Sequence, residues 1–125
     1  MDVTARVPVG RQIINSYGDG GFRIAGTAYA GPVLVFPERT LAWSVVTISA
    51  ISLESLLPVF EASPRVELLL VGCGRSIAYI PKPLREGLRE KGVSVDAMGT
   101  GAACRTYNVL LAESRRIAAA LLPID

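Results

Sequence analysis

The sequence predicts an α/β domain in which antiparallel strands come first and a parallel β-α-β-α segment follows. Short runs rich in β-branched and aromatic residues, separated by turn-forming residues, fill the first half of the chain. Near Ser52 the hydrophobic period changes from two to the helical period, and helix-like and strand-like segments then alternate. Because a chain of 125 residues suits one domain, we expect residues 1–125 to form a single domain with a mixed sheet and helices packed on it.

The β-rich runs of the first half predict an antiparallel meander. The turn-forming sequence Asp19-Gly20-Gly21 separates the first two runs, and Pro32 and Pro37 lie at the ends of the next two. Both proline positions favour strand ends, because proline has no N–H to donate within a sheet. The expected strands are residues 12–17, 22–29, 33–36 and 41–48.

The second half predicts two βα units with parallel strands. The run at 66–71 is almost continuously apolar, which is typical of a strand buried on both faces of a parallel sheet. Gly92 favours the end of one helix and Pro123 the end of another. Connections of this kind between parallel strands are right-handed. The expected elements are a short helix at 52–60, a strand at 66–71, a helix at 83–91, a strand at 93–97 and a long helix at 102–122.

The composition excludes several classes of site. The chain has no histidine, so Ser-His-Asp or Cys-His catalysis and histidine-ligated metal sites are excluded. Its two cysteines, Cys73 and Cys104, form no Cys-x-x-Cys pair, so we expect no structural metal and no cofactor. A net charge of +2 with 6% aromatic residues is a poor match to a nucleic-acid-binding surface, and we expect no nucleic-acid partner.

We also expect no membrane span. The longest uncharged runs, 24–37 and 40–53, contain proline or several serines and threonines. Neither run reaches the roughly 20 apolar residues that a spanning helix needs. Residues 1–6 lack the apolar segment of a signal peptide. The sequence therefore predicts a cytoplasmic protein.

A pair of glycine-bracketed loops is the most informative feature of the sequence. Gly72-Cys73-Gly74 follows one predicted parallel strand, and Gly99-Thr100-Gly101 follows the other. Ligands of open α/β sheets bind beyond the carboxyl ends of the strands, and the second loop opens a helix, whose first N–H groups favour an anion. If the strands are neighbours, the loops form a crevice with basic walls. The predicted ligand-binding residues are Gly72, Cys73, Gly74, Arg75, Gly99, Thr100, Arg105 and Asn108.

A purely structural interpretation of the same residues stays open. The glycines would then form tight turns, and Thr100 would cap the last helix. Arg105 either binds an anion or pairs internally with Glu113. Cys73 at the strand end and Cys104 in the first helical turn lie where a thiolate is favoured, but both also suit small buried positions. No catalytic residue is predicted.

Three groups of residues carry a resemblance to a known family. They are Ser16-Tyr17-Gly18 with Gly21-Phe22, Gly72-x-Gly74 after an apolar strand, and Met98-x-Thr100-x-x-Ala103-x-Arg105-Thr106-Tyr107-Asn108-x-Leu110 followed by Glu113-x-Arg115 and Ala118-Ala119-Ala120-Leu121. Over residues 11–122 the chain resembles a widespread small α/β family of unknown function. That family includes a mitochondrial assembly factor for respiratory complex I and a vertebrate adipogenesis-associated protein. The resemblance implies a compact sandwich around a mixed sheet and no established catalytic residues. Cys73 stands where relatives commonly have threonine, and Ser114 stands where glycine is frequent.

Two functions follow as expectations. The resemblance implies a non-enzymatic assembly or scaffold factor with a protein partner, such as a respiratory or other membrane complex under assembly. An apolar patch around Tyr29, Phe36 and Trp43 is a candidate surface for that partner. The alternative is a small-molecule or anion-binding protein, or an enzyme, in which Arg75 and Arg105 hold a small anion between the two loops.

Overall fold

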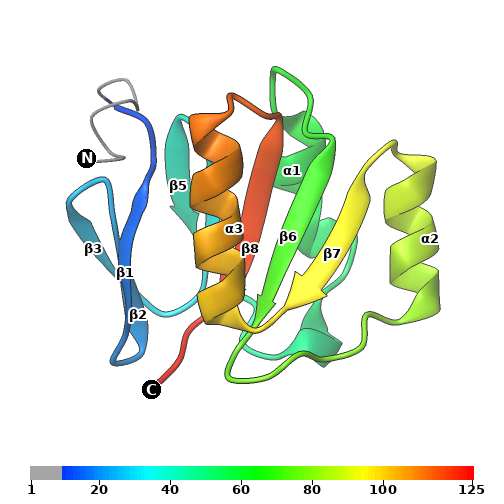
Figure 1. Ribbon diagram of the computed structural model, residues 1–125. Coiled ribbons are helices and arrows are strands. Elements are labelled where there is room, and N and C mark those ends of the chain that lie inside the picture. Colours follow the sequence, from blue (N-terminus) through cyan, green and yellow to red (C-terminus); the bar gives the residue numbers. More distant parts are fainter. Residues whose placement is uncertain (1–9) are drawn as a thin grey trace.

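A five-stranded mixed sheet forms the centre of the molecule, in the order β5-β4-β8-β6-β7 (Figure 1). The computed structural model describes residues 10–125, so the segment 1–6, considered above as a targeting signal, lies outside the described residues. The strands of this sheet are β4 (Val33–Phe36), β5 (Arg39–Ala42), β6 (Leu68–Cys73), β7 (Ser94–Met98) and β8 (Ile117–Leu122). The pairs β6–β7 and β6–β8 are parallel, whereas β4–β5 and β4–β8 are antiparallel. The predicted α/β class with a mixed sheet is confirmed.

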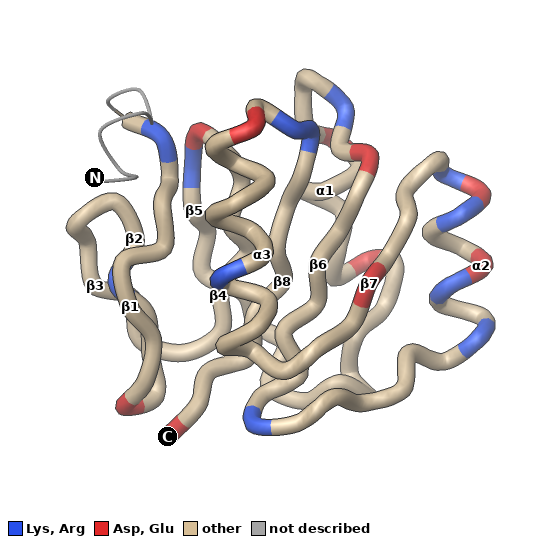
Figure 2. Tube along the Cα trace, in the orientation of Figure 1, with Lys and Arg blue, Asp and Glu red and all other residues tan. Residues whose placement is uncertain are grey.

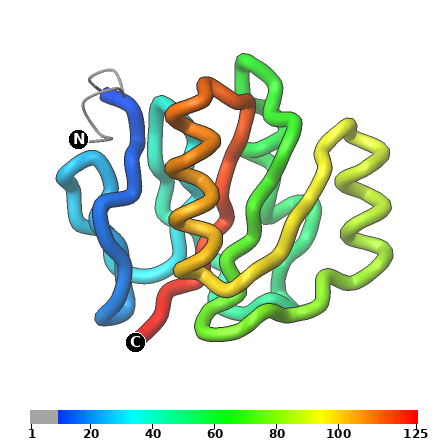
Figure 3. The backbone as a smooth tube through the Cα atoms, viewed as in Figure 1, coloured from blue at the N-terminus to red at the C-terminus, as the bar shows by residue number. Residues whose placement is uncertain are grey.

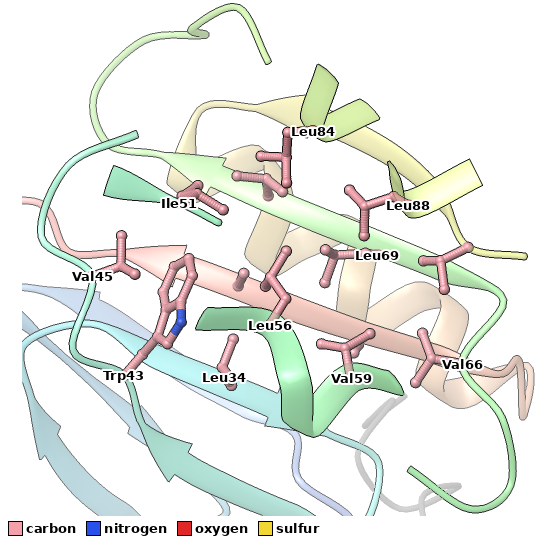
Figure 4. Close-up of a cluster of buried hydrophobic side chains, with 14 of the residues drawn as sticks. Leu34, Trp43, Val45, Ile51, Leu56, Val59, Val66, Leu69, Leu84 and Leu88 are labelled. Carbon is pink, nitrogen blue, oxygen red and sulfur yellow. The ribbon is translucent and has the colours of Figure 1, made fainter. Parts of the chain in front are cut away.

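Each face of the sheet packs against a different layer. On one face lie α1 (Leu57–Glu61), α2 (Lys82–Glu90) and two short 3-10 helices, Ile48–Ala50 and Glu54–Leu56. Figure 4 shows Leu84 and Leu88 of α2 close to Leu69 of β6 in the hydrophobic cluster on this face. The other face carries α3 (Thr100–Ala112) and a small second sheet.

The small sheet contains β1 (Ile14–Gly18), β2 (Gly21–Ile24) and β3 (Thr27–Ala30), paired as an antiparallel meander. The expected single strand at 22–29 is wrong, because Ala25 (φ 49°) and Gly26 (φ 82°) turn the chain back on itself. The end of the chain lies beside the turn between β1 and β2, where the Gly20 N–H donates to the Ile124 carbonyl at 2.8 Å (Figure 3).

The expected strand at 41–48 is also wrong, because β5 ends at Ala42. Trp43 and Val45 leave the sheet and are buried in the cluster beneath α1 and α2. The indole N–H of Trp43 donates to the Ser55 carbonyl at 2.9 Å, which fixes the side chain there. Phe36 is buried as well, so the expected apolar patch around Trp43 and Phe36 is absent.

The largest correction concerns the expected long helix at 102–122. Helix α3 ends at Ala112, and Ser114 adopts a left-handed conformation (φ 58°) that turns the chain into β8. All six residues of β8 are buried, because the strand lies between β4 and β6 with packed layers on both faces. Strand β8 therefore joins the antiparallel and parallel parts into one sheet.

Candidate functional site

The two glycine-bracketed loops meet at one edge of the sheet, as the sequence predicts. Strands β6 and β7 are parallel neighbours, so both loops leave the sheet at its lower edge in Figure 1. The Thr100 N–H donates to the Gly74 carbonyl at 2.8 Å, and the Gly74 N–H donates to Thr100 Oγ1 at 2.8 Å. These two reciprocal bonds fasten the loops to each other.

The Thr100 hydroxyl is an internal connector. Its oxygen accepts from Gly74, and its proton is donated to the Leu122 carbonyl at 2.6 Å. The residue has no exposed surface. A hydroxyl has only one proton to donate, and Thr100 donates it to Leu122. The Thr100 hydroxyl therefore connects the ends of β6 and β8 to the start of α3 and has no proton left to donate to a ligand.

Two glycines of these loops, Gly72 and Gly101, allow close packing. A Cβ atom on Gly72 would lie 2.9 Å from Cδ2 of Leu121 and 3.1 Å from Cα of Thr100. A Cβ atom on Gly101 would lie 2.5 Å from the Tyr17 hydroxyl oxygen. All three distances are shorter than normal van der Waals contact. Gly72 is needed for the fit between elements because the Thr100 backbone would have to move, whereas at Gly101 the partly exposed Tyr17 side chain can turn away.

Asn108 and Arg105 tie α3 to the small sheet. The Asn108 side chain donates to the Ile14 carbonyl and accepts from the Ile14 N–H, both at 2.9 Å, as a neighbouring strand would. Arg105 Nη1 donates to the Tyr17 hydroxyl at 3.3 Å. The internal pairing of Arg105 with Glu113 is not formed; Glu113 lies 4.0 Å from Arg115 instead.

Arg75 and Arg105 both lie next to the Gly99–Gly101 loop, and both are exposed. The position of a Cβ on Gly99 is 3.5 Å from the Arg75 carbonyl oxygen, and that on Gly101 is 3.3 Å from Arg105 Nη1. Arg75 also donates to the backbone carbonyl of Asp125 at 3.2 Å. The Arg75 side chain is thus directed to the end of the chain and the Arg105 side chain to Tyr17, while the Thr100 hydroxyl and the Gly74 and Thr100 amides bond internally.

The two cysteines differ in their surroundings. Cys104 is 3% exposed, and burial raises the pKa of its thiol from 9.0 to about 12, although the charge of Arg105 opposes the rise. Of the two interpretations that the sequence leaves open for Cys104, the structure favours the small buried residue over the stabilised thiolate. Cys73 is half-buried, with its sulfur 3.8 Å from the Val71 carbonyl oxygen.

We expect dithionitrobenzoate at about pH 8 to modify Cys73 rapidly and Cys104 only after denaturation. Burial both shields the Cys104 sulfur and keeps it protonated, whereas Cys73 is partly accessible. The measurement is the number of thiols released in native and denatured protein, with Cys73→Ala as control. Rapid reaction of the native Cys73→Ala variant would contradict the expectation.

The same burial predicts a loss of stability at high pH. The Cys104 thiol has a higher pKa in the folded protein, about 12, than its ordinary value of 9.0. Its contribution to the free energy of unfolding is therefore complete below pH 9.0 and is lost as the pH rises toward 12. Cys104 alone should contribute up to about 1.4 kcal/mol per pH unit to the fall of the unfolding free energy in this range. Cys104→Ala should reduce the slope, measured by urea denaturation at several pH values.

Two hollows stand out on the described surface, and neither is lined by any of the eight predicted residues. One lies between α2 and β7, and its charged lining includes Lys82, Arg85 and Arg89. The other lies at the opposite edge of the sheet from the two loops and has Arg39 and Arg116 in its wall. The second hollow is not evident from the sequence, in which the adjacent Arg115 and Arg116 are the local sign of it. Within residues 10–125, no cluster of three acidic or cysteine side chains could hold a metal ion.

Residues 14–122 match the family described as Protein of unknown function (DUF498/DUF598). The chain belongs to this family. It is 40% identical over 110 residues to a Xenopus tropicalis protein named NADH dehydrogenase (ubiquinone) 1 alpha subcomplex assembly factor 3, covering 88% of this chain. The chain spans 60% of the length of that protein. An uncharacterized protein of Rhodobacter capsulatus is 40% identical over 111 residues, which are 89% of this chain and 84% of that protein.

A solved structure at a similar level of sequence identity has the same fold. A crystal structure described as an outer membrane protein from Bartonella henselae superposes with a TM-score of 0.85 at 39% identity, covering 94% of this chain and 98% of that chain. In the part of this chain that is described, no helix has both the length and the apolar character to cross a membrane. The signature residues Thr100 and Asn108 of this DUF498/DUF598 member bond to the backbone of neighbouring elements.

Proposed function

We propose that this chain is a non-enzymatic assembly factor that holds a protein partner while a respiratory membrane complex is built. The observation that carries the proposal is the 40% identity, over 88% of the chain, to a protein named as a complex I assembly factor. The geometry supports it, because Thr100 and Asn108 use their polar atoms to hold the fold together. A protein of this kind acts through its surface.

The loop of residues 74–81, between β6 and α2, supports a partner-binding role. Ile77 and Tyr79 on this loop are 70% and 79% exposed. Ile80 beside them is only 1% exposed and anchors the loop in the core. Large apolar and aromatic side chains held outward by an anchored loop suit the centre of a protein interface. We name residues 74–81 the docking loop.

The replacement Ile77→Ser/Tyr79→Ser should abolish the co-purification of respiratory-complex subunits with the tagged protein from its own cells. Both side chains are exposed, so the double variant should keep the melting temperature of the unmodified protein. The measurement is mass spectrometry of the captured proteins at low detergent. Val109→Ser, at a 58% exposed position on α3, is the matched control and should retain the partners.

Two results would count against this proposal. Capture of the same respiratory subunits by the double variant would show that the docking loop is not part of the interface. Normal levels of assembled complex I in cells that lack the gene would remove the assembly role itself.

Two finer expectations stay predictions. A small anion at the rim of the two loops is favoured by the exposed Arg75 and Arg105, which flank the Gly99–Gly101 loop. The cytoplasmic location is likewise a prediction from the sequence.

A further inference from the structure

The second hollow lies at the edge of the sheet where β4 ends and β8 begins. Antiparallel pairing of β4 with β8 brings the Phe36 end of one strand to the Ile117 end of the other. The hollow has a volume of about 360 Å³, in the range of small-molecule sites. Figure 2 shows charged residues gathered along this upper edge of the molecule.

Four arginines line the hollow against two glutamates. They are Arg11, Arg39, Arg115 and Arg116, with Glu38 and Glu61 as the acidic members. Pro37, Ala62 and Pro64, which are half-buried or exposed, supply apolar surface elsewhere in the wall. The lining therefore combines a positive charge excess with an apolar surface.

The ion pairs of these arginines are long. Arg11 lies 3.9 Å from Glu38, and Arg116 lies 3.8 Å from Glu67. Charge-assisted hydrogen bonds are about 2.7–2.9 Å long, so both pairs are loose contacts. The Arg116–Glu67 pair is also exposed and of small value, whereas the Arg11 side chain is only 21% exposed. The Arg39 guanidinium lies 5.0 Å from the centre of the Phe36 ring. These guanidinium groups keep N–H donors that an anion could use.

A buried donor points to a missing acceptor nearby. The Nε atom of Arg11 is buried and has no hydrogen-bond partner among the described residues. The hydroxyl of Tyr107, a residue with no exposed surface that does not itself line the hollow, also lacks a partner in this part of the chain. Burial raises the pKa of Tyr107 while the charge of Arg11 lowers it, so the two groups are within electrostatic reach. Buried polar groups of this kind normally bond to water or a ligand.

We propose that this hollow binds a small phosphate monoester, with the arginines on the phosphate oxygens and Pro37, Ala62 and Pro64 against the organic group. Guanidinium groups bind phosphate through paired N–H donors, and several together suit a dianion better than a single carboxylate. The site is separate from the docking loop, and this inference stands independently of the assembly role.

Titration calorimetry with phenyl phosphate at constant ionic strength tests the proposal. We expect saturable binding to the unmodified protein and at least a tenfold weaker affinity for Arg39→Gln/Arg116→Gln. Arg85→Gln/Arg89→Gln on α2 removes the same charge from the other hollow and should bind as the unmodified protein does. Both pairs contain exposed side chains, and a melting curve of each variant checks that the fold is kept.

Three results would overturn the proposal. The first is no saturable binding of phenyl phosphate at millimolar concentration. The second is an equal loss of affinity in the two double variants, which would indicate attraction by net charge alone. The third is equally tight binding of phenylacetate, which would assign the hollow to carboxylates, including acidic side chains of a protein partner.

Discussion

Replacing Thr100 with valine is expected to lower the free energy of unfolding by about 3 kcal/mol. Valine has nearly the shape of threonine but cannot bond. The substitution leaves the Gly74 N–H and the Leu122 carbonyl without the partner that each now has at 2.8 and 2.6 Å. Both groups lie where the ends of β6 and β8 meet the start of α3. Urea denaturation followed by circular dichroism measures the change.

Thr100→Ser is the matched control, because it keeps the hydroxyl and removes only a methyl group. Its expected cost is about 1 kcal/mol, the value of one buried methyl. Two results would show that the hydroxyl does not connect these elements. One is a Thr100→Val variant as stable as the unmodified protein, and the other is a Thr100→Ser variant that loses as much unfolding free energy as Thr100→Val. A thermal scan of both variants gives an independent reading of the same difference.

The position of the two loops could be predicted, but the use of Thr100 could not. Strand periodicity and the glycines place both loops at one sheet edge, and the structure confirms this. The acceptor of the Thr100 proton is in β8, however, and the sequence predicts a helix there. Without that strand, a buried threonine in a loop is as consistent with a ligand site as with a connector.

The alanine-rich segment near the end of the chain leads to the helix prediction, because alanine has the highest intrinsic helix propensity. Six consecutive apolar residues at 117–122 fit a strand buried on both faces as well as a helix. The four polar residues at 113–116 were the available sign of an interruption. In the structure, the chain turns at Ser114, and residues 117–122 pair as a strand with β4 on one side and β6 on the other.

The arginine-lined hollow could not be predicted because its residues come from distant segments. Arg11, Arg39 and Arg116 meet only when β8 enters the sheet beside β4. A sequence analysis that lacks β8 cannot bring these three together. Similarly, the exposure of Ile77 and Tyr79 depends on how the docking loop is anchored by Ile80.

Replacing Leu121 with alanine tests the position of β8 directly. Leu121 is fully buried and lies opposite Gly72 in the register of β6 and β8. Its truncation should cost about 3 kcal/mol of unfolding free energy, through lost burial and the cavity left behind. Gly72→Ala alone should cost about 2 kcal/mol, because the added Cβ is too close to Leu121 and Thr100.

The two changes should not add when combined. Alanine at position 121 removes the Cδ2 atom that a Cβ at 72 would meet at 2.9 Å, so Gly72→Ala should cost about 1 kcal/mol less in the Leu121→Ala background. Leu88→Ala, equally buried but on α2, is the control background and should leave the cost of Gly72→Ala unchanged. Part of that cost should persist in every background, since Thr100 Cα would still lie 3.1 Å from the new atom. Full additivity with Leu121→Ala would mean that β8 does not pack against β6 at this pair. In that case Leu122 would not lie where it accepts the hydrogen bond from Thr100 either.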